Sequence, residues 1–156
     1  MRYKKILVPY DRSVSAQMAL KEAIEIAHDC KDAKVTVFYV ADVPDFNDAT
    51  FEAAAKMSGV AAVGDVDSEK LRQNYLLAAG SEIESDTADL VGADHGIVEY
   101  AVGRGKPNRA IVKYASENGS DLIVMGSRGL NAVSGMLGSV SYAVLRSASC
   151  PVMVVK

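Results

Sequence analysis

The residues with the clearest potential for chemistry lie in a segment of glycines and hydroxyl side chains between positions 126 and 141. Glycine lets a backbone approach a ligand closely and turn its amide N–H groups toward it. Gly138 and Ser139 stand where a predicted helix begins, and the free N–H groups and dipole of a helix N-terminus favour an anion. Ser139 and Ser141 add hydroxyl groups, and Arg128 adds a permanent positive charge. We therefore expect this segment to bind a polyphosphate.

Asp11, which follows Pro9 near the N-terminus, is the second candidate. Its carboxylate would repel phosphate, so a ribose hydroxyl or a metal ion is a better partner. Spacing alone leaves two simpler interpretations open: the glycine-rich segment is only a tight turn, and Ser139 is only a helix cap. Other phosphate motifs do not match, because the sequence has no P-loop. The nearest dinucleotide fingerprint, at residues 103–105, lacks its third glycine and does not open the first helix.

Five short, continuous apolar runs predict strands that are buried on both faces of a sheet. They cover residues 5–10, 35–40, 96–102, 121–125 and 151–155. Helices are predicted over residues 13–29, 68–91, 107–118 and 139–147 from apolar spacing and from turn signals. The predicted buried stripe of the first helix is Ala16, Ala19, Leu20, Ala23, Ile24 and Ala27, and that of the long helix is Leu71, Tyr75, Leu76, Ala79, Ile83 and Leu90. Periodicity is weak over 41–65, where we expect an excursion with a short helix over 49–57.

This alternation of strands and helices predicts an α/β fold, a five-stranded parallel sheet with helices on both faces. If the first strand is central and the chain first winds one way, the fourth strand must start the other side, and we expect the strand order 3-2-1-4-5. No second core or linker is visible, so residues 1–156 are expected to form a single domain. Ligands of such sheets bind beyond the carboxyl ends of the strands, where the strand order reverses. The crevice should therefore lie between the segments that follow Val8 and Met125, which brings Asp11 close to the glycine-rich segment.

Composition and charge exclude several classes of protein. Seventeen Lys and Arg against twenty Asp and Glu give a net charge of −3, which argues against a nucleic-acid-binding surface. No run approaches the roughly 20 apolar residues of a membrane span, and the apolar run 6–8 is too short for a secretory signal. Cys30, Cys150, His28 and His95 are isolated and match neither a disulfide framework nor a zinc site. We expect a cytoplasmic protein that binds neither nucleic acid nor membrane and has no metal site of its own.

The order of these motifs resembles the universal stress protein family, of the ATP-binding type, over nearly the whole chain. The matching segments are 4–13 (KKILVPYDRS), the strand that ends at Val40, 102–107 (VGRGKP), 121–129 (DLIVMGSRG), 138–141 (GSVS) and 150–155 (CPVMVV). The resemblance implies a Rossmann-like domain that binds an adenine nucleotide, ATP, with Mg²⁺ or Mn²⁺ held through the phosphates. It also implies a homodimer in which the strand 151–155 pairs antiparallel with its copy.

The resemblance further implies a place for each site residue. Pro9, Asp11 and Val40 would line the adenosine part, with Asp11 on the ribose and the backbone of Val40 on adenine. The ribose and phosphates would be surrounded by Met125, Gly126, Arg128, Gly129, Gly138, Ser139, Val140 and Ser141. ATP-binding members carry the pattern Gly-x2-Gly-x9-Gly-Ser/Thr, whereas only the eight residues 130–137 separate the last two glycines here. The shortening affects the phosphate end of the site more than the adenosine end.

Three functions are compatible with these residues. The first is a regulatory protein of the stress response that signals through ATP binding. The second is a slow ATPase or phosphotransferase, in which Arg128 would stabilise the transferred phosphoryl group, although no obvious base accompanies it. The third is a dimeric interaction module that does not use nucleotide. We favour the first.

Overall fold

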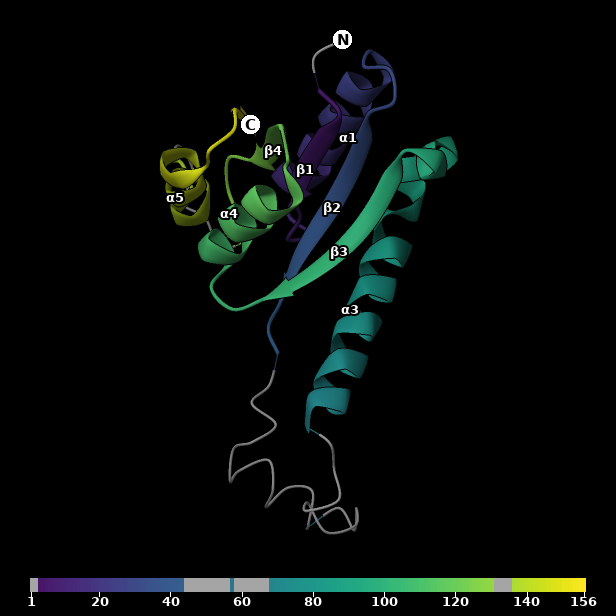
Figure 1. Ribbon diagram of the computed structural model, residues 1–156, viewed down its shortest axis with the longest axis vertical. Coiled ribbons are helices and arrows are strands. Elements are labelled where there is room, and N and C mark those ends of the chain that lie inside the picture. The colour runs from purple at the N-terminus through teal and green to yellow at the C-terminus, as the bar shows by residue number, and fades with distance from the viewer. Residues whose placement is uncertain (1–2, 44–56, 58–67, 131–135) are drawn as a thin grey trace.

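The structure of the protein is a computed structural model that describes residues 3–43, 57, 68–130 and 136–156. Five strands form one sheet in the order β3-β2-β1-β4-β5, and all strand pairs are parallel (Figure 1). The strands are β1 (Lys5–Pro9), β2 (Lys34–Ala41), β3 (Val98–Arg104), β4 (Leu122–Gly126) and β5 (Val152–Val155). The predicted fold class and strand order are confirmed.

Helices cover both faces of the sheet, as predicted. They are α1 (Val14–His28), α3 (Ser68–Val91), α4 (Pro107–Asn118) and α5 (Ser139–Ser147), with the short 3-10 helix η2 (Gly92–Gly96) before β3. One core cluster joins α1 and α3 to the sheet, and a second joins α4 and α5 to its opposite face. Successive residues of a strand point to opposite faces. Accordingly Ile6 and Val8 belong to the first cluster, and Leu7 belongs to the second.

The two long helices differ in how far the sheet covers them. α1 buries all six residues of its predicted stripe. α3 buries Ala79 and Ile83, together with Thr87 and Val91, whereas Tyr75 of the predicted stripe is 40% exposed. The first turns of α3 extend past the end of the sheet, so the sheet covers only its second half (Figure 1). In the first half of the helix the predicted stripe is therefore only partly buried, since Leu71 and Leu76 are half-buried and Tyr75 is exposed.

Caps and turns set the ends of these elements. The Ser13 hydroxyl caps α1 by accepting a hydrogen bond from the Ala16 N–H at 3.2 Å. β3 begins at Val98, later than predicted, because the preceding residues form η2. The short helix predicted over 49–57 lies, apart from Met57, outside the described residues. Among the described helices, none is long and apolar enough to span a membrane.

His28 at the end of α1 and Asp94 in η2 form a pH-dependent contact. Nε2 of His28 lies 2.7 Å from Oδ1 of Asp94. This hydrogen bond and the negative charge of Asp94 raise the pKa of His28 above its ordinary value of 6.5. Because the pKa is raised in the folded state, the contact stabilises the fold fully below the unfolded-state pKa. That stabilisation is lost as the pH rises through the folded-state pKa.

We expect His28→Gln to lower the melting temperature by about 1–2 °C at about pH 5.5 and by less at about pH 9. The effect is small because the His28 side chain is 48% exposed, so that water screens the ion pair. Thermal unfolding of the wild type and the variant across this pH range measures the difference. Asp94→Asn should give the same profile, and a difference that does not change with pH would contradict this assignment.

Candidate functional site

A cavity of about 570 Å³ opens at the carboxyl ends of β1, β2 and β4. All eleven residues predicted for the site line this cavity: Pro9, Asp11, Val40, Met125, Gly126, Arg128, Gly129, Gly138, Ser139, Val140 and Ser141. They come together because β1 lies between β2 and β4 in the sheet, so the segments that follow these three strands meet at one edge.

Asp11 is half-buried and lies directly before α1. Its Oδ1 accepts a hydrogen bond from the Ser13 backbone N–H at 3.0 Å, which fixes the carboxylate in an Asx turn. Its Oδ2 faces the loop after β4, since a methyl group on Gly129 would lie 2.9 Å from this oxygen. Gly129 is therefore needed for the close approach between the loop and the carboxylate, and Oδ2 has no hydrogen-bond donor among the described residues.

Two serines of α1 hold the loop after β4 in place. Ser15 Oγ donates a hydrogen bond to the Arg128 backbone carbonyl at 2.6 Å, and Ser13 Oγ donates to the same oxygen at 3.3 Å. With its backbone anchored in this way, Arg128 lines the cavity, and its guanidinium forms no ion pair with the described residues. Neither serine was among the predicted site residues, and their contact with the loop after β4 depends on how α1 packs on the sheet.

Gly126 and Ser141 line the cavity and hold its surrounding elements close together. A methyl group on Gly126 would lie 2.3 Å from Ser15 Oγ and 2.9 Å from the Ala16 backbone nitrogen, so only glycine lets α1 pack this closely on β4. Ser141 is buried, and its hydroxyl donates to the Gly126 carbonyl at 2.9 Å. The sequence suggested that this hydroxyl could bind a ligand, but its proton is already used in a hydrogen bond within the protein.

The N-terminus of α5 lies at the cavity. Gly138 is the N-cap, and among the described residues no side chain caps the helix. The Gly138 N–H itself donates to the Ser127 carbonyl at 2.8 Å, which secures the entry into the helix. Ser139 and Val140, the first two helical residues, line the cavity. Uncapped amide groups and the helix dipole make this end of the cavity suitable for an anion. Ser139 is therefore not the helix cap that the simpler interpretation allowed.

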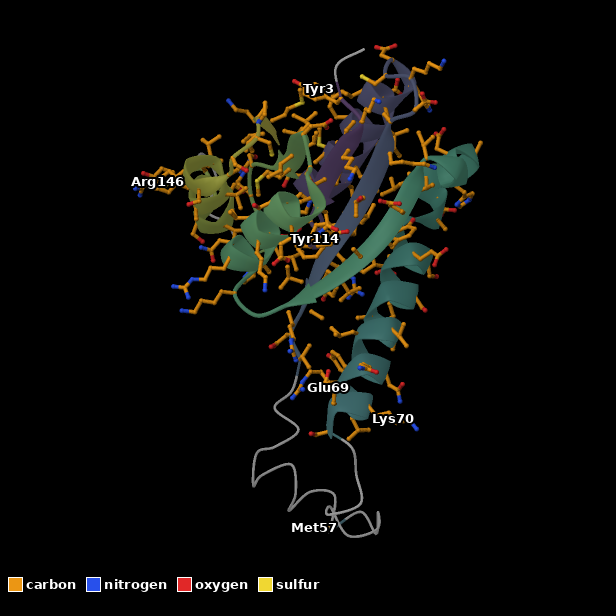
Figure 2. All side chains as sticks on the ribbon, viewed as in Figure 1. Tyr3, Met57, Glu69, Lys70, Tyr114 and Arg146 are labelled. Atoms are coloured by element: carbon orange, nitrogen blue, oxygen red, sulfur yellow. The ribbon has the colours of Figure 1, made fainter. Side chains whose placement is uncertain are left out.

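Apolar side chains form the remaining walls, and sequence reasoning did not predict them as site residues. Phe38, Ile111, Met136 and Leu137 line the cavity. The Phe38 ring stacks on Tyr114 of α4 with 4.4 Å between the ring centroids, and Figure 2 shows Tyr114 between α4 and the sheet. The sequence shows that a strand residue is apolar. It does not show whether that residue faces a cavity or the packed core, because this depends on which helix covers the strand.

Tyr10 and Arg12 flank Asp11 in sequence and connect the site to α3. Burial, and then the negative charge of Asp86, raise the pKa of Tyr10, which keeps its hydroxyl neutral. Arg12 has a left-handed backbone with φ 69°. Its guanidinium pairs with Glu82 at 3.2 Å and Asp86 at 2.8 Å and lies 5.4 Å from the ring centroid of Tyr39, a cavity residue.

We expect Arg12→Ala to lower the free energy of unfolding by about 1 kcal/mol, because two half-exposed ion pairs contribute little and the left-handed backbone persists. Arg12→Gly loses the same contacts but removes the backbone strain, so it should be about 1 kcal/mol more stable than Arg12→Ala. Urea unfolding of the two variants measures this difference. Equal stabilities would show that the backbone at this position is not strained.

Known proteins resemble this chain along nearly its whole length. A profile of the Universal stress protein family matches residues 2–156 of the chain. The chain belongs to the universal stress protein family. Among curated universal stress proteins, MJ0531 of Methanocaldococcus jannaschii is 34% identical over 155 residues, which is 99% of this chain and 82% of the relative.

Solved structures of universal stress proteins share the fold described above. UspA from Lactobacillus plantarum is 26% identical, with a TM-score of 0.73 and coverage of 100% of this chain and 99% of the other. A universal stress protein solved in complex with cAMP is 25% identical, with a TM-score of 0.63 and coverage of 100% and 99%. At least one protein of this family and fold therefore binds an adenine nucleotide.

Proposed function

We propose that this universal stress protein binds an adenine nucleotide, ATP in the first place, in the cavity beyond β1, β2 and β4, and that it regulates a stress response in the cytoplasm through this binding. The observation that carries the proposal is that one cavity contains both the N-terminus of α5 and the carboxylate of Asp11. An uncapped helix N-terminus suits phosphates, and a carboxylate with a free oxygen suits ribose hydroxyls. The cAMP complex of a relative supports the same ligand class.

The residues present fit such a ligand. Asp11 would accept hydrogen bonds from the ribose, and the backbone of Val40 would contact adenine beside the apolar wall of Phe38 and Ile111. The amide groups of Ser139 and Val140 and the guanidinium of Arg128 would hold the phosphates. No group of three or more metal-ligating side chains occurs among the described residues, so Mg²⁺ or Mn²⁺ would be held through the phosphates.

The edge of the sheet suits a homodimer. β5 pairs only with β4 among the described strands, and Met153 in its centre is 38% exposed. An open apolar edge favours pairing with another chain, and the family resemblance suggests antiparallel pairing of β5 with its copy. Sedimentation equilibrium tests this directly, since a dimer has twice the mass of the 16.6 kDa chain.

The experiment that tests nucleotide binding is thermal unfolding with and without ATP and Mg²⁺. A ligand present at about 100 times its Kd stabilises the folded state by about 2.7 kcal/mol, which raises the melting temperature of a domain of this size by about 5–10 °C. Mg²⁺ alone is the control and should cause no such shift. Parallel titrations with AMP and cAMP rank the possible ligands. A melting curve that millimolar ATP leaves unchanged would favour the interaction module instead.

A further inference from the structure

A second hollow, of about 610 Å³, lies next to the first cavity and has a different character. It is lined by Ala41, Asp42 and Val43 after β2, by Arg72 of α3 and by residues 104–106 between β3 and α4. Figure 1 shows the end of β2 between the β3–α4 connection and the first turns of α3, and Figure 2 labels Glu69 and Lys70 at those turns. Three segments that are distant in sequence thus form one concave surface.

Among the described residues that line this hollow, most of the charged side chains are positive. Arg72, Arg104 and Lys106 face it together with one carboxylate, that of Asp42, whereas the chain as a whole carries a net charge of −3. Arg72 forms an ion pair with Glu69. Arg104 and Lys106 are exposed and form no ion pair with the part of the chain that the structure describes. Cations gathered around a concave surface raise the local concentration of anions.

The backbone explains why both unpaired cations reach the same hollow. The β2–β3 ladder places Arg104 opposite Ala41, at the last pair of the ladder. Gly105 follows with φ +94°, a conformation that turns the chain from β3 into α4 and that side chains rarely adopt. A methyl group on Gly105 would meet nothing within 4 Å, so the backbone at the turn is open to solvent. Arg104 and Lys106 therefore flank an accessible turn.

We propose that this second hollow binds a small polyphosphate anion, at a site separate from the first cavity. The guanidinium of Arg104 matches the geometry of phosphate oxygens, and the ammonium of Lys106 adds a second positive charge, while Arg72 is already paired with Glu69. The two cations on either side of Gly105 can each contact a different phosphate group, which favours a chain of phosphates over a single phosphate ion. The two sites have no lining residue in common among the described residues, although Val40 and Pro107 of the first are next in sequence to Ala41 and Lys106 of the second.

The test is a calorimetric titration of the full chain with inorganic tripolyphosphate at low ionic strength, where exposed cations bind most strongly. Arg104→Ala/Lys106→Ala should lose at least about tenfold in affinity, because two charge-assisted contacts are removed. The matched control is Lys21→Ala/Lys31→Ala, which removes the same charge from exposed positions on α1 and in the loop after it. The affinity of this control variant for tripolyphosphate should lie within about twofold of the wild-type affinity.

A third variant, Ser139→Asp, separates this site from the first cavity. It should retain tripolyphosphate binding, because Ser139 lines only the first cavity. If this variant binds tripolyphosphate and GTP with equal affinity, the second hollow recognises the phosphate chain alone. If it binds GTP more tightly, the second hollow also recognises the nucleoside, and the phosphate chain comes from a nucleotide. The proposal is overturned if Arg104→Ala/Lys106→Ala binds tripolyphosphate as the wild type does. It is equally overturned if Ser139→Asp abolishes the binding. The first result leaves the proposal of ATP binding in the first cavity intact, whereas the second would place the tripolyphosphate beside Ser139 and support a phosphate site there.

Discussion

Replacing Ser139 with aspartate is expected to weaken ATP binding at least about 100-fold at about 0.15 M salt, where weak binding to exposed cations is screened. The carboxylate would stand at the first residue of α5, beside the N–H groups proposed for the phosphates. Two unit charges about 4 Å apart repel by roughly 4 kcal/mol near a protein surface, so one such contact with a phosphate exceeds the 2.7 kcal/mol that a 100-fold change requires. Calorimetric titration with ATP and Mg²⁺ measures the loss.

The fold should tolerate this change. An acidic side chain at a helix N-terminus stabilises the helix dipole, so Ser139→Asp without ligand should melt at the wild-type temperature or slightly above it. The neutral variant Ser139→Asn keeps a polar side chain of similar size without the charge, and should bind ATP within about tenfold of the wild type. If Ser139→Asp binds ATP as tightly as the wild type, the phosphates do not lie at the N-terminus of α5.

Gly126→Ala is expected to destabilise the protein by about 3 kcal/mol, at the upper end of what overpacking costs. Its methyl group would lie 2.3 Å from Ser15 Oγ, 2.8 Å from the Ser15 carbonyl carbon and 2.9 Å from the Ala16 nitrogen. The serine hydroxyl can rotate away, but the two backbone atoms cannot. The start of α1 must therefore move off β4, which also strains the 2.6 Å hydrogen bond from Ser15 to the Arg128 carbonyl.

Urea unfolding of the purified variant measures this loss. Gly96→Ala is the matched control, because a methyl group there meets nothing within 4 Å, and its free energy of unfolding should change by less than about 0.5 kcal/mol. The double variant Ser15→Ala/Gly126→Ala tests the cause: it removes the contact with the hydroxyl and keeps both backbone contacts, so it should not recover stability. A loss below about 1 kcal/mol in Gly126→Ala would mean that α1 adapts easily.

The same glycine shows how far the site could be predicted from sequence. Gly126 was predicted as a residue around the ribose and phosphates, and it does line the cavity. Its closest neighbours, however, are the backbone and side chain of α1. Ser141 is similar, since its hydroxyl binds the Gly126 carbonyl rather than pointing freely at a ligand. Both residues line the cavity, but their immediate contacts within the fold could not be predicted from sequence.

The sequence by itself determined the sheet, its strand order and the set of residues that meet at its carboxyl edge. Continuous apolar runs identify buried parallel strands, and glycines and hydroxyl residues after β1 and β4 mark the edge at which we expect a ligand. These signals are local, because each depends on the composition and spacing of one short segment.

Only the tertiary structure decided which side chains contact one another across the site. Arg12 pairs with Glu82 and Asp86, some seventy positions away, and Ser15 anchors the carbonyl of Arg128. Arg104 and Lys106 meet Arg72 around the second hollow for the same reason. Hydrogen bonds and ion pairs require distances of a few ångströms, and these are set by how helices pack on the sheet, which the spacing of residues in one segment does not encode.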